Sequence, residues 1–143
     1  MKFRNTGMSL IELLTVMAVV ALLSAVAVAT YSSYSLRANR TEARTVILKT
    51  QAAEEKYFLQ NDVYTSDFID APPVGLGITG SATTVNGYYT ITLTAGSTGA
   101  IGTSFLVTAT AANGQTRDIA ACHVLTIDDQ GNRSPADSTG CWK

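Results

Sequence analysis

The stretch KFRNTGMSLIELLTV, residues Lys2 to Val16, places a carboxylate, Glu12, at the start of an apolar run of membrane length. From Leu13 to Leu36 the chain carries no charged side chain, and as a helix these 24 residues would be about 36 Å long at ~1.5 Å per residue. That length spans a bilayer core of ~30 Å. Because Lys2 and Arg4 precede the run, the positive-inside rule predicts a cytoplasmic N-terminus and an extracytoplasmic remainder.

The choice between the interpretations of this segment depends on Glu12. A secretory signal peptide would have the same basic start and apolar run, and AVA at Ala27 to Ala29 offers a small-x-small cleavage site. A plain membrane anchor would also fit the hydropathy. Neither explains a carboxylate in the apolar run, which costs ~2.5 kcal/mol or more in a bilayer. We therefore expect Glu12 to be functional and to have a partner.

The six residues Gly7-Met8-Ser9-Leu10-Ile11-Glu12, after a short basic leader, closely resemble the processing site of type IV prepilins. The resemblance implies that a membrane peptidase cleaves between Gly7 and Met8 and methylates the new N-terminus at Met8. Glu12 then becomes the fifth residue of the mature chain. Its carboxylate is expected to meet the N-terminal ammonium of a neighbouring subunit, so that two buried charges compensate each other.

The sequence departs from the pilin pattern at three positions. Met8 stands where phenylalanine is commoner in the family, and Ala21 and Ala29 stand where many pilins carry glycine and proline. Alanine is the strongest helix former. We therefore expect an uninterrupted helix from about Ser9 to Gln60.

Composition limits the rest of the chain to one modest domain. The 143 residues are 46% hydrophobic, and only one segment is long and apolar enough for a membrane. The formal net charge is −1 with no block of like charges, which gives no electrostatic footprint for nucleic acid or anionic lipid. Nucleic acid is therefore not an expected partner.

The second part of the helix, residues 37–60, has two apolar faces at 100° per residue. The wider face is expected to pack on the chain's own sheet and the narrower one on neighbouring subunits, although an ordinary amphipathic helix with irregular edges explains the narrower face equally well. The wider face comprises Leu36, Ala43, Val46, Ile47, Thr50, Ala53, Tyr57 and Phe58, and the narrower Leu48, Ala52 and Leu59.

After this helix the pattern changes to an irregular connection and then to strands. Glycines and prolines mark residues 62–87 as a loop. Alternating apolar residues predict strands at 88–94, 104–111 and 122–127, with a short fourth strand near 133–134. These signals predict an α+β fold, in which a small antiparallel meander packs on the long helix, and the type IV pilin resemblance implies the same architecture.

Cys122 and Cys141 are the only cysteines, and in an exported chain their simplest state is a disulfide. The last hairpin, which ends in Cys-Trp, resembles the disulfide-bounded region of type IV pilins and is most like minor pilins of the PilE kind. In the chain-entropy model, closing a loop of about 20 residues adds ~3 kcal/mol of stability.

The expected domain organisation follows from these elements. Residues 1–7 are a prepilin leader, 8–35 the transmembrane and assembly half of the helix, and 36–143 an extracytoplasmic head. Within the head we expect helix 36–60, a variable loop 62–87, a sheet over 88–135 and a disulfide region 122–141.

No catalytic, cofactor or metal site is expected. The single histidine, His123, lies in a predicted strand, and the sequence has no GxSxG motif or matched nucleophile and base. The turn DDQGN contains Asp128, Asp129 and Asn132 but lacks the spacing and terminal glutamate of a calcium loop. For DNA capture the tail offers only Arg133, Trp142 and Lys143 for backbone contacts and stacking.

The sequence thus predicts a structural subunit of a type IV pilus, most simply a minor pilin without enzymatic activity, involved in pilus biogenesis, twitching motility or adhesion. The expected partners are other pilins through the N-terminal helix, the prepilin peptidase and the inner-membrane assembly machinery. The chain would reside in the inner membrane before assembly and in the extracellular filament afterwards. A major pilin, a type II secretion pseudopilin and a pilus-borne DNA receptor are the alternatives.

Overall fold

The computed structural model describes residues 9–78 and 83–142. One long helix, α1 (Leu10–Asn61), is followed by four strands, β1 (Tyr89–Ala95), β2 (Phe105–Ala111), β3 (Val124–Asp128) and β4 (Arg133–Ser134). Three short 3₁₀ helices are η1 (Asn113–Arg117), η2 (Ala120–Cys122) and η3 (Asp137–Thr139). The chain divides into two compact units, residues 1–35 and residues 36–143, which we describe separately.

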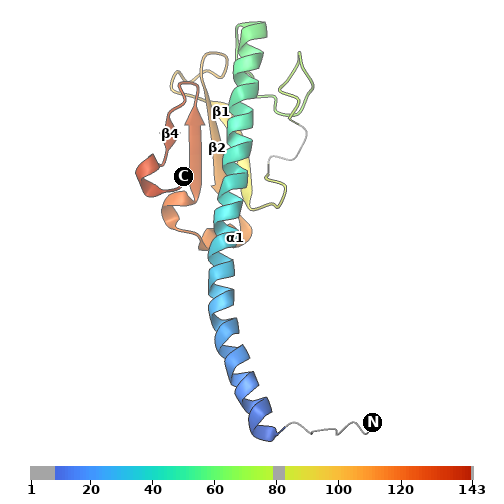
Figure 1. Ribbon diagram of the computed structural model, residues 1–143. Coiled ribbons are helices and arrows are strands. Elements are labelled where there is room, and N and C mark those ends of the chain that lie inside the picture. Colours follow the sequence, from blue (N-terminus) through green and yellow to red (C-terminus); the bar gives the residue numbers. More distant parts are fainter. Residues whose placement is uncertain (1–8, 79–82, 143) are drawn as a thin grey trace, which may run out of the picture. The chain divides into compact units, whose positions relative to one another are not determined.

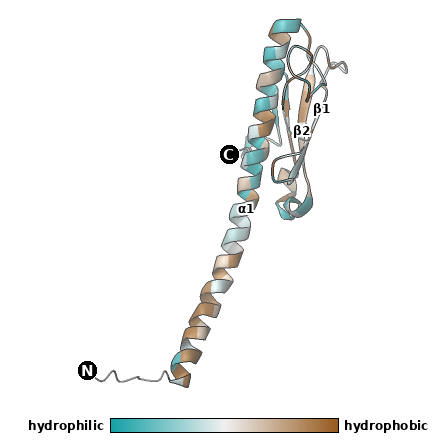
Figure 2. Cartoon of the chain, turned by 90° about the vertical axis from the view of Figure 1, so that its right-hand side faces the viewer, coloured by the Kyte–Doolittle hydropathy of each residue, from teal (hydrophilic) through white to brown (hydrophobic). Residues whose placement is uncertain are grey.

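The first unit is the apolar half of α1. By length and composition this helix could cross a membrane. Its residues from Leu10 to Val28 are all exposed, and its large aliphatic side chains leave more than half of their surface uncovered. Figure 2 shows the hydrophobic colour concentrated in this half of the helix, whereas the later turns are mixed. An apolar surface of this kind needs a cover that this unit does not provide.

The second unit, the head, packs a four-stranded sheet against the later part of α1 (Figure 1). The strands follow the order β1-β2-β3-β4, and every neighbouring pair is antiparallel. Leu93 pairs with Val107, and Val107 pairs with Ile127, so apolar residues lie side by side on the face toward the helix. The predicted α+β meander on a long helix is confirmed.

The core of the head combines residues from the helix, the strands and the C-terminal region. Alternate strand residues point inward because side chains in a strand alternate between its two faces. The buried apolar residues of this cluster are Ala43, Ile47, Tyr89, Ile91, Phe105, Val107, Ala109, Cys122, Leu125, Ile127, Cys141 and Trp142.

Two details of the predicted head were wrong. The third strand begins at Val124 instead of Cys122, because Cys122 ends the turn η2 and His123 follows with α-helical dihedral angles. The wider helix face also contains two polar residues that the projection did not assign to it, Asn39 and Glu54, which are 8% and 0% exposed. They were missed because apolar periodicity cannot detect a polar side chain that tertiary hydrogen bonds make tolerable in the interior.

The narrower apolar face of the helix is exposed in the isolated chain. Leu48 is 39% exposed and Leu59 is 84% exposed, and Ala52 is also exposed. The wider face, by contrast, buries Ala43, Ile47 and Thr50 completely. The single chain therefore covers one of the two predicted faces.

Candidate functional site

The predicted assembly residue lies in the first turn of α1. The backbone N–H of Glu12 donates to the carbonyl of Ser9 at 3.1 Å, and the Glu12 side chain is exposed. Within the described part of the chain its carboxylate has no hydrogen bond or ion pair. Gly7 and Met8, the predicted processing site, lie outside the described residues.

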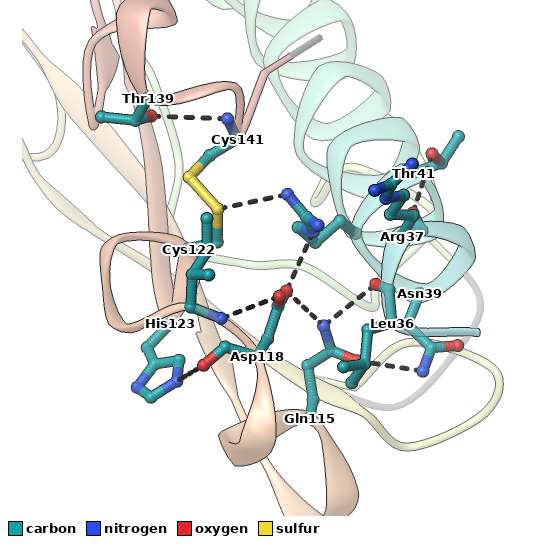
Figure 3. Close-up of polar contacts among 12 residues, drawn as sticks. Leu36, Arg37, Asn39, Thr41, Gln115, Asp118, Cys122, His123, Thr139 and Cys141 are labelled. Atoms are coloured by element: carbon teal, nitrogen blue, oxygen red, sulfur yellow. Dashed lines mark hydrogen bonds and ion pairs between the residues drawn. A yellow bond between two sulfur atoms is a disulfide. The ribbon is translucent and has the colours of Figure 1, made fainter. Parts of the chain in front are cut away.

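The head has a buried polar network that joins the helix to the segment after β2 (Figure 3). At its centre is Gln115, which is 0% exposed and comes from η1. Its side-chain nitrogen lies 3.1 Å from the carbonyl of Leu36, 2.9 Å from Asp118 Oδ2 and 3.3 Å from the Tyr89 hydroxyl. Its side-chain oxygen accepts from Asn39 at 3.0 Å. This one amide therefore fixes the start of the head helix against the rest of the head.

An ion pair extends the network to the cysteine region. Arg40 Nε lies 2.9 Å from Asp118 Oδ2 as a close ion pair without the alignment of a hydrogen bond, and both side chains are largely buried. Arg40 Nη1 also contacts Cys122 Sγ at 3.4 Å. Removing either partner would leave a largely buried charge, which is costly. Sequence reasoning missed Gln115, Asp118 and Arg40 because they lie in a polar turn and a polar helix strip, where no local pattern distinguishes buried residues from exposed ones.

Cys122 and Cys141 form a disulfide with a Cα–Cα distance of 5.3 Å. Both residues are 0% exposed and belong to the core cluster. The Tyr89 hydroxyl donates to the carbonyl of Cys122 at 3.0 Å, and burial raises the pKa of this tyrosine, so it remains a donor at neutral pH. The bridge thus holds the C-terminal segment on the core.

Glu54 is the most unusual ionisable group of the head. It is 0% exposed, and its Oε2 accepts a hydrogen bond from the backbone N–H of Thr65 at 3.2 Å, while its Oε1 has no partner in the described residues. Burial raises the pKa of Glu54 to about 7, against the lowering effect of that hydrogen bond, and the charge of Glu55 raises it further. A substantial fraction of Glu54 is therefore protonated at neutral pH.

The features that could suggest catalysis or metal binding have structural roles. A ring nitrogen of His123 lies 2.9 Å from the carbonyl of Asp118. In the DDQGN turn, Asp128 accepts from the backbone N–H groups of Gln130 and Asn132 and from the Asn132 amide, which are the contacts of a closed hairpin turn. Among the described residues, no group of three or more histidines, cysteines or acids is placed to hold a metal ion.

In the C-terminal tail, the side chains that the DNA-capture alternative would use, Arg133 and Trp142, contact the chain itself. Trp142 is 8% exposed, and its indole N–H donates to the carbonyl of Ser134 at 3.2 Å. The guanidinium of Arg133 lies over the indole ring, 5.3 Å from its centroid. The indole is thus largely covered by the chain itself in this conformation.

Comparisons with known proteins agree with this architecture. The family model described as "Type IV minor pilin ComP, DNA uptake sequence receptor" matches residues 29–126, and the model described as "Prokaryotic N-terminal methylation motif" matches residues 2–28. Among solved structures, a type IV pilin from Shewanella oneidensis has a TM-score of 0.53 at 23% identity, over 76% of this chain and 98% of that one. No curated protein matches.

The structural similarity concerns the fold, and the family matches carry the assignment further. The two matched ranges, 29–126 and 2–28, adjoin without overlapping and together cover nearly the whole chain. The long helix, the antiparallel meander and the C-terminal disulfide are those of a pilin. This chain is a member of the type IV minor pilin family and a structural subunit of the pilus.

Proposed function

We propose that the chain is cut between Gly7 and Met8, methylated at Met8 by the prepilin peptidase, and assembled through its N-terminal helix. Residues 1–7 would then be the leader, 8–35 the membrane and assembly segment, and 36–143 the head. The division of the structure into units at 35 and 36 supports the last boundary. The match of the methylation motif to residues 2–28 supports the first.

The observation that carries the assembly proposal is the exposed carboxylate of Glu12 on an apolar helix, which has no ion pair among residues 9–78 and 83–142. In a membrane such a charge is expensive, and at a helix N-terminus it can meet a cation that a neighbour supplies. We propose that this cation is the terminal ammonium of a neighbouring pilin. Before assembly the helix would lie in the inner membrane with its N-terminus in the cytoplasm, and the machinery there would deliver it to the extracellular filament. The chain would act by helix packing rather than by catalysis.

Intact-mass measurement of the membrane form tests the processing step. We expect a chain that starts at N-methylated Met8. Processing also removes Lys2 and Arg4, so the mature protein is more acidic than the precursor. A mature chain that retains Met1, or one that starts at Thr30 after signal-peptidase cleavage, contradicts the proposal.

A second function, DNA binding by the assembled or membrane-held subunit, is favoured by one observation. The family model that matches residues 29–126 is described as a DNA uptake sequence receptor, and this range covers most of the head. We propose that the head binds double-stranded DNA. Fluorescence anisotropy of a labelled duplex with the full mature chain in neutral detergent micelles tests this at low and physiological salt. Absence of binding at low salt would refute it.

A further inference from the structure

The segment that follows α1 folds back beside the last turns of the helix (Figure 1). We call residues 62–78 the strap. Backbone hydrogen bonds within the strap, with N···O distances of 3.0, 2.8 and 3.0 Å, bring its two ends together. Their donor and acceptor residues are Leu76 and Asp67, Gly77 and Asp70, and Ile78 and Phe68. The strap is thus a small folded unit of its own.

Two neighbouring acids of α1 attach the start of the strap to the helix. Glu54 Oε2 accepts a hydrogen bond from the backbone N–H of Thr65 at 3.2 Å. The Tyr64 hydroxyl donates to Glu55 Oε1 at 3.4 Å. Both distances lie at or beyond the long end of the usual range for hydrogen bonds. Each of these polar attachments is therefore weak.

The other contacts of the strap involve neutral groups. The Tyr64 ring stacks on Phe58 with a centroid distance of 4.6 Å and meets Phe105 edge-on at 4.9 Å. The Tyr57 hydroxyl donates to the carbonyl of Val74 at 3.4 Å. Ring contacts of this kind do not depend on a charge. A change of pH can therefore loosen the strap through the acids of α1 and not through these contacts.

The surroundings of Glu54 disfavour a negative charge. Its side chain is 0% exposed, and its Oε1 has no hydrogen-bond partner in the described part of the chain. The neighbouring titratable groups are Glu55 on the same helix and Tyr64 on the strap. The β3–β4 turn contributes Asp129, whose charge acts on Tyr64, and the buried residues of β2 and β3 are apolar. Among the described residues no cation forms an ion pair with Glu54, so a charge there is stabilised only by the Thr65 N–H.

The pKa values at this junction reflect these surroundings. Burial raises the pKa of Glu54 to about 7, and the charge of Glu55 raises it further. Burial and the nearby acids also raise the pKa of Tyr64, which therefore stays a neutral donor. In the strap, hydrogen bonds from backbone N–H groups lower the pKa of Asp67, which stays ionised near neutral pH. Glu54 thus changes its charge near pH 7, whereas Tyr64 and Asp67 do not.

We propose that Glu54 and the strap form a pH-sensitive clasp, in which the protonated acid keeps the strap on the helix and loss of its proton to water releases the strap. An ionised carboxylate in the interior is costly, and movement of the strap lets water reach it. The strap is the part that yields, because α1 and the sheet are held by continuous backbone hydrogen bonds. Release also separates the Tyr64 ring from Phe58.

The direction of the pH effect follows from linkage. In the closed state Glu54 titrates near pH 7, and in the released state it titrates at its ordinary value of 4.5. The closed state is therefore most favoured below pH 4.5, and the ratio of released to closed strap rises by up to about tenfold per pH unit until about pH 7. Above that pH Glu54 is ionised in both states, and the ratio no longer changes.

Hydrogen exchange of the full chain in neutral detergent micelles tests the clasp. Backbone amides of the strap and of β2 are followed between pH 5 and pH 8, and their protection is corrected for the intrinsic pH dependence of exchange. We expect the strap amides, that of Thr65 included, to lose more than about tenfold of their protection between pH 5 and pH 7.5. They should also remain at least about tenfold less protected than β2 amides and be insensitive to low urea concentrations, since a local opening exposes little surface.

Two variants with the same change in charge identify the group that titrates. Glu54→Gln should raise the protection of the strap by about tenfold or more at pH 7.5 and remove its pH dependence, since the amide never ionises. Asp137→Asn, which neutralises an exposed acid of η3, is the matched control. Its strap protection should stay within about twofold of wild type at every pH.

Three results would overturn the inference. If the strap amides are protected as strongly as those of β2, the strap opens only when the whole head unfolds. If their corrected protection does not change between pH 5 and pH 8, no titrating group controls the strap. If Glu54→Gln keeps the pH dependence of wild type, another group is responsible. The first two comparisons use the wild-type chain alone, so they decide the question even if Glu54→Gln does not fold.

Discussion

Each half of α1 carries a notable carboxylate, and the surroundings of the two carboxylates are opposite. In the first half, Glu12 is exposed on an apolar surface and has no ion pair within the described chain. In the second half, Glu54 is completely buried. The head supplies a backbone N–H donor to its carboxylate, and burial raises the pKa of Glu54 to about 7. The two halves of the helix therefore obtain their partners from different sources. The head completes its half of the helix, while the first half is incomplete until another molecule covers it.

The largest expected effect tests the incomplete half. Glu12→Val should enter the membrane at least as well as wild type, because a charge that disfavours the bilayer is removed. Its incorporation into sheared pili should nevertheless fall by more than about a hundredfold, since removing one partner of a buried ion pair costs ~3–5 kcal/mol. Immunoblots of the filament and membrane fractions measure both quantities.

Two controls separate pairing from general disruption of the segment. Thr15→Val lies in the same apolar stretch and removes only a hydroxyl that bonds the Glu12 carbonyl, so incorporation should persist. Glu12→Asp keeps the charge on a shorter side chain and should incorporate partially. Normal filament levels of Glu12→Val would show that the first half needs no charged partner.

The Cys122–Cys141 disulfide contributes to how firmly the head holds its own half of the helix. Replacing both Cys122 and Cys141 by serine should lower the melting midpoint of the head by about 10 °C, because losing a bridge of this size costs ~2–4 kcal/mol. Hydrogen exchange should accelerate in the helix after Leu36 and remain unchanged from Leu13 to Leu23. Thiol labelling of the native wild-type chain is the check on the starting state: two reactive thiols per folded chain would contradict the bridge.

The next expected effect is a pH dependence of head stability caused by Glu54, and its sign follows from the direction of the Glu54 pKa shift. The folded pKa, about 7, lies above the ordinary value of 4.5, so between these two pH values the folded head holds a proton that the unfolded chain releases. Head stability should therefore fall as pH rises through this window, by a total on the order of 3 kcal/mol.

Glu54→Gln is the variant that isolates this titration, since an amide imitates the protonated acid in shape and never ionises. Its melting midpoint should exceed that of wild type at pH 8 and approach it near pH 4.5. Glu55→Gln is the neighbouring control, and it should leave the pH dependence largely intact. A Glu54→Gln head that is less stable than wild type at pH 8 would mean that the buried carboxylate is held by a cation.

The sequence predicts the apolar segments of this molecule and does not predict the buried polar contacts of the head. The apolar run from Leu13 to Leu36 and the alternation in β1 and β2 were visible because burial or membrane contact leaves a periodic trace in the sequence. The Gln115 network was invisible, since a buried polar residue is defined by partners distant in sequence, such as Leu36 and Asn39. Glu12 was predicted to be functional for the opposite reason: it interrupts an apolar pattern, whereas Glu54 stands in a part of the helix already rich in polar residues.

The smallest expected effect concerns the continuity of the helix across both halves. In the single chain α1 runs without interruption from Leu10 to Asn61, in agreement with the alanines at positions 21 and 29. Ala21→Gly should cost ~1 kcal/mol of helix stability, so amide exchange near position 21 should accelerate by about fivefold in micelles, while the head keeps its melting midpoint. Ala52→Gly, placed on an exposed site in the second half, is the matched control, and its effect should appear in the head instead.

We further predict that the wild-type helix stays continuous after incorporation, since residues 21–29 contain no glycine or proline that would favour opening of the helix there. A filament map with extended backbone in that interval would show that packing against neighbours overrides local propensity, and the first half would then depend on its partners for conformation as well as for charge.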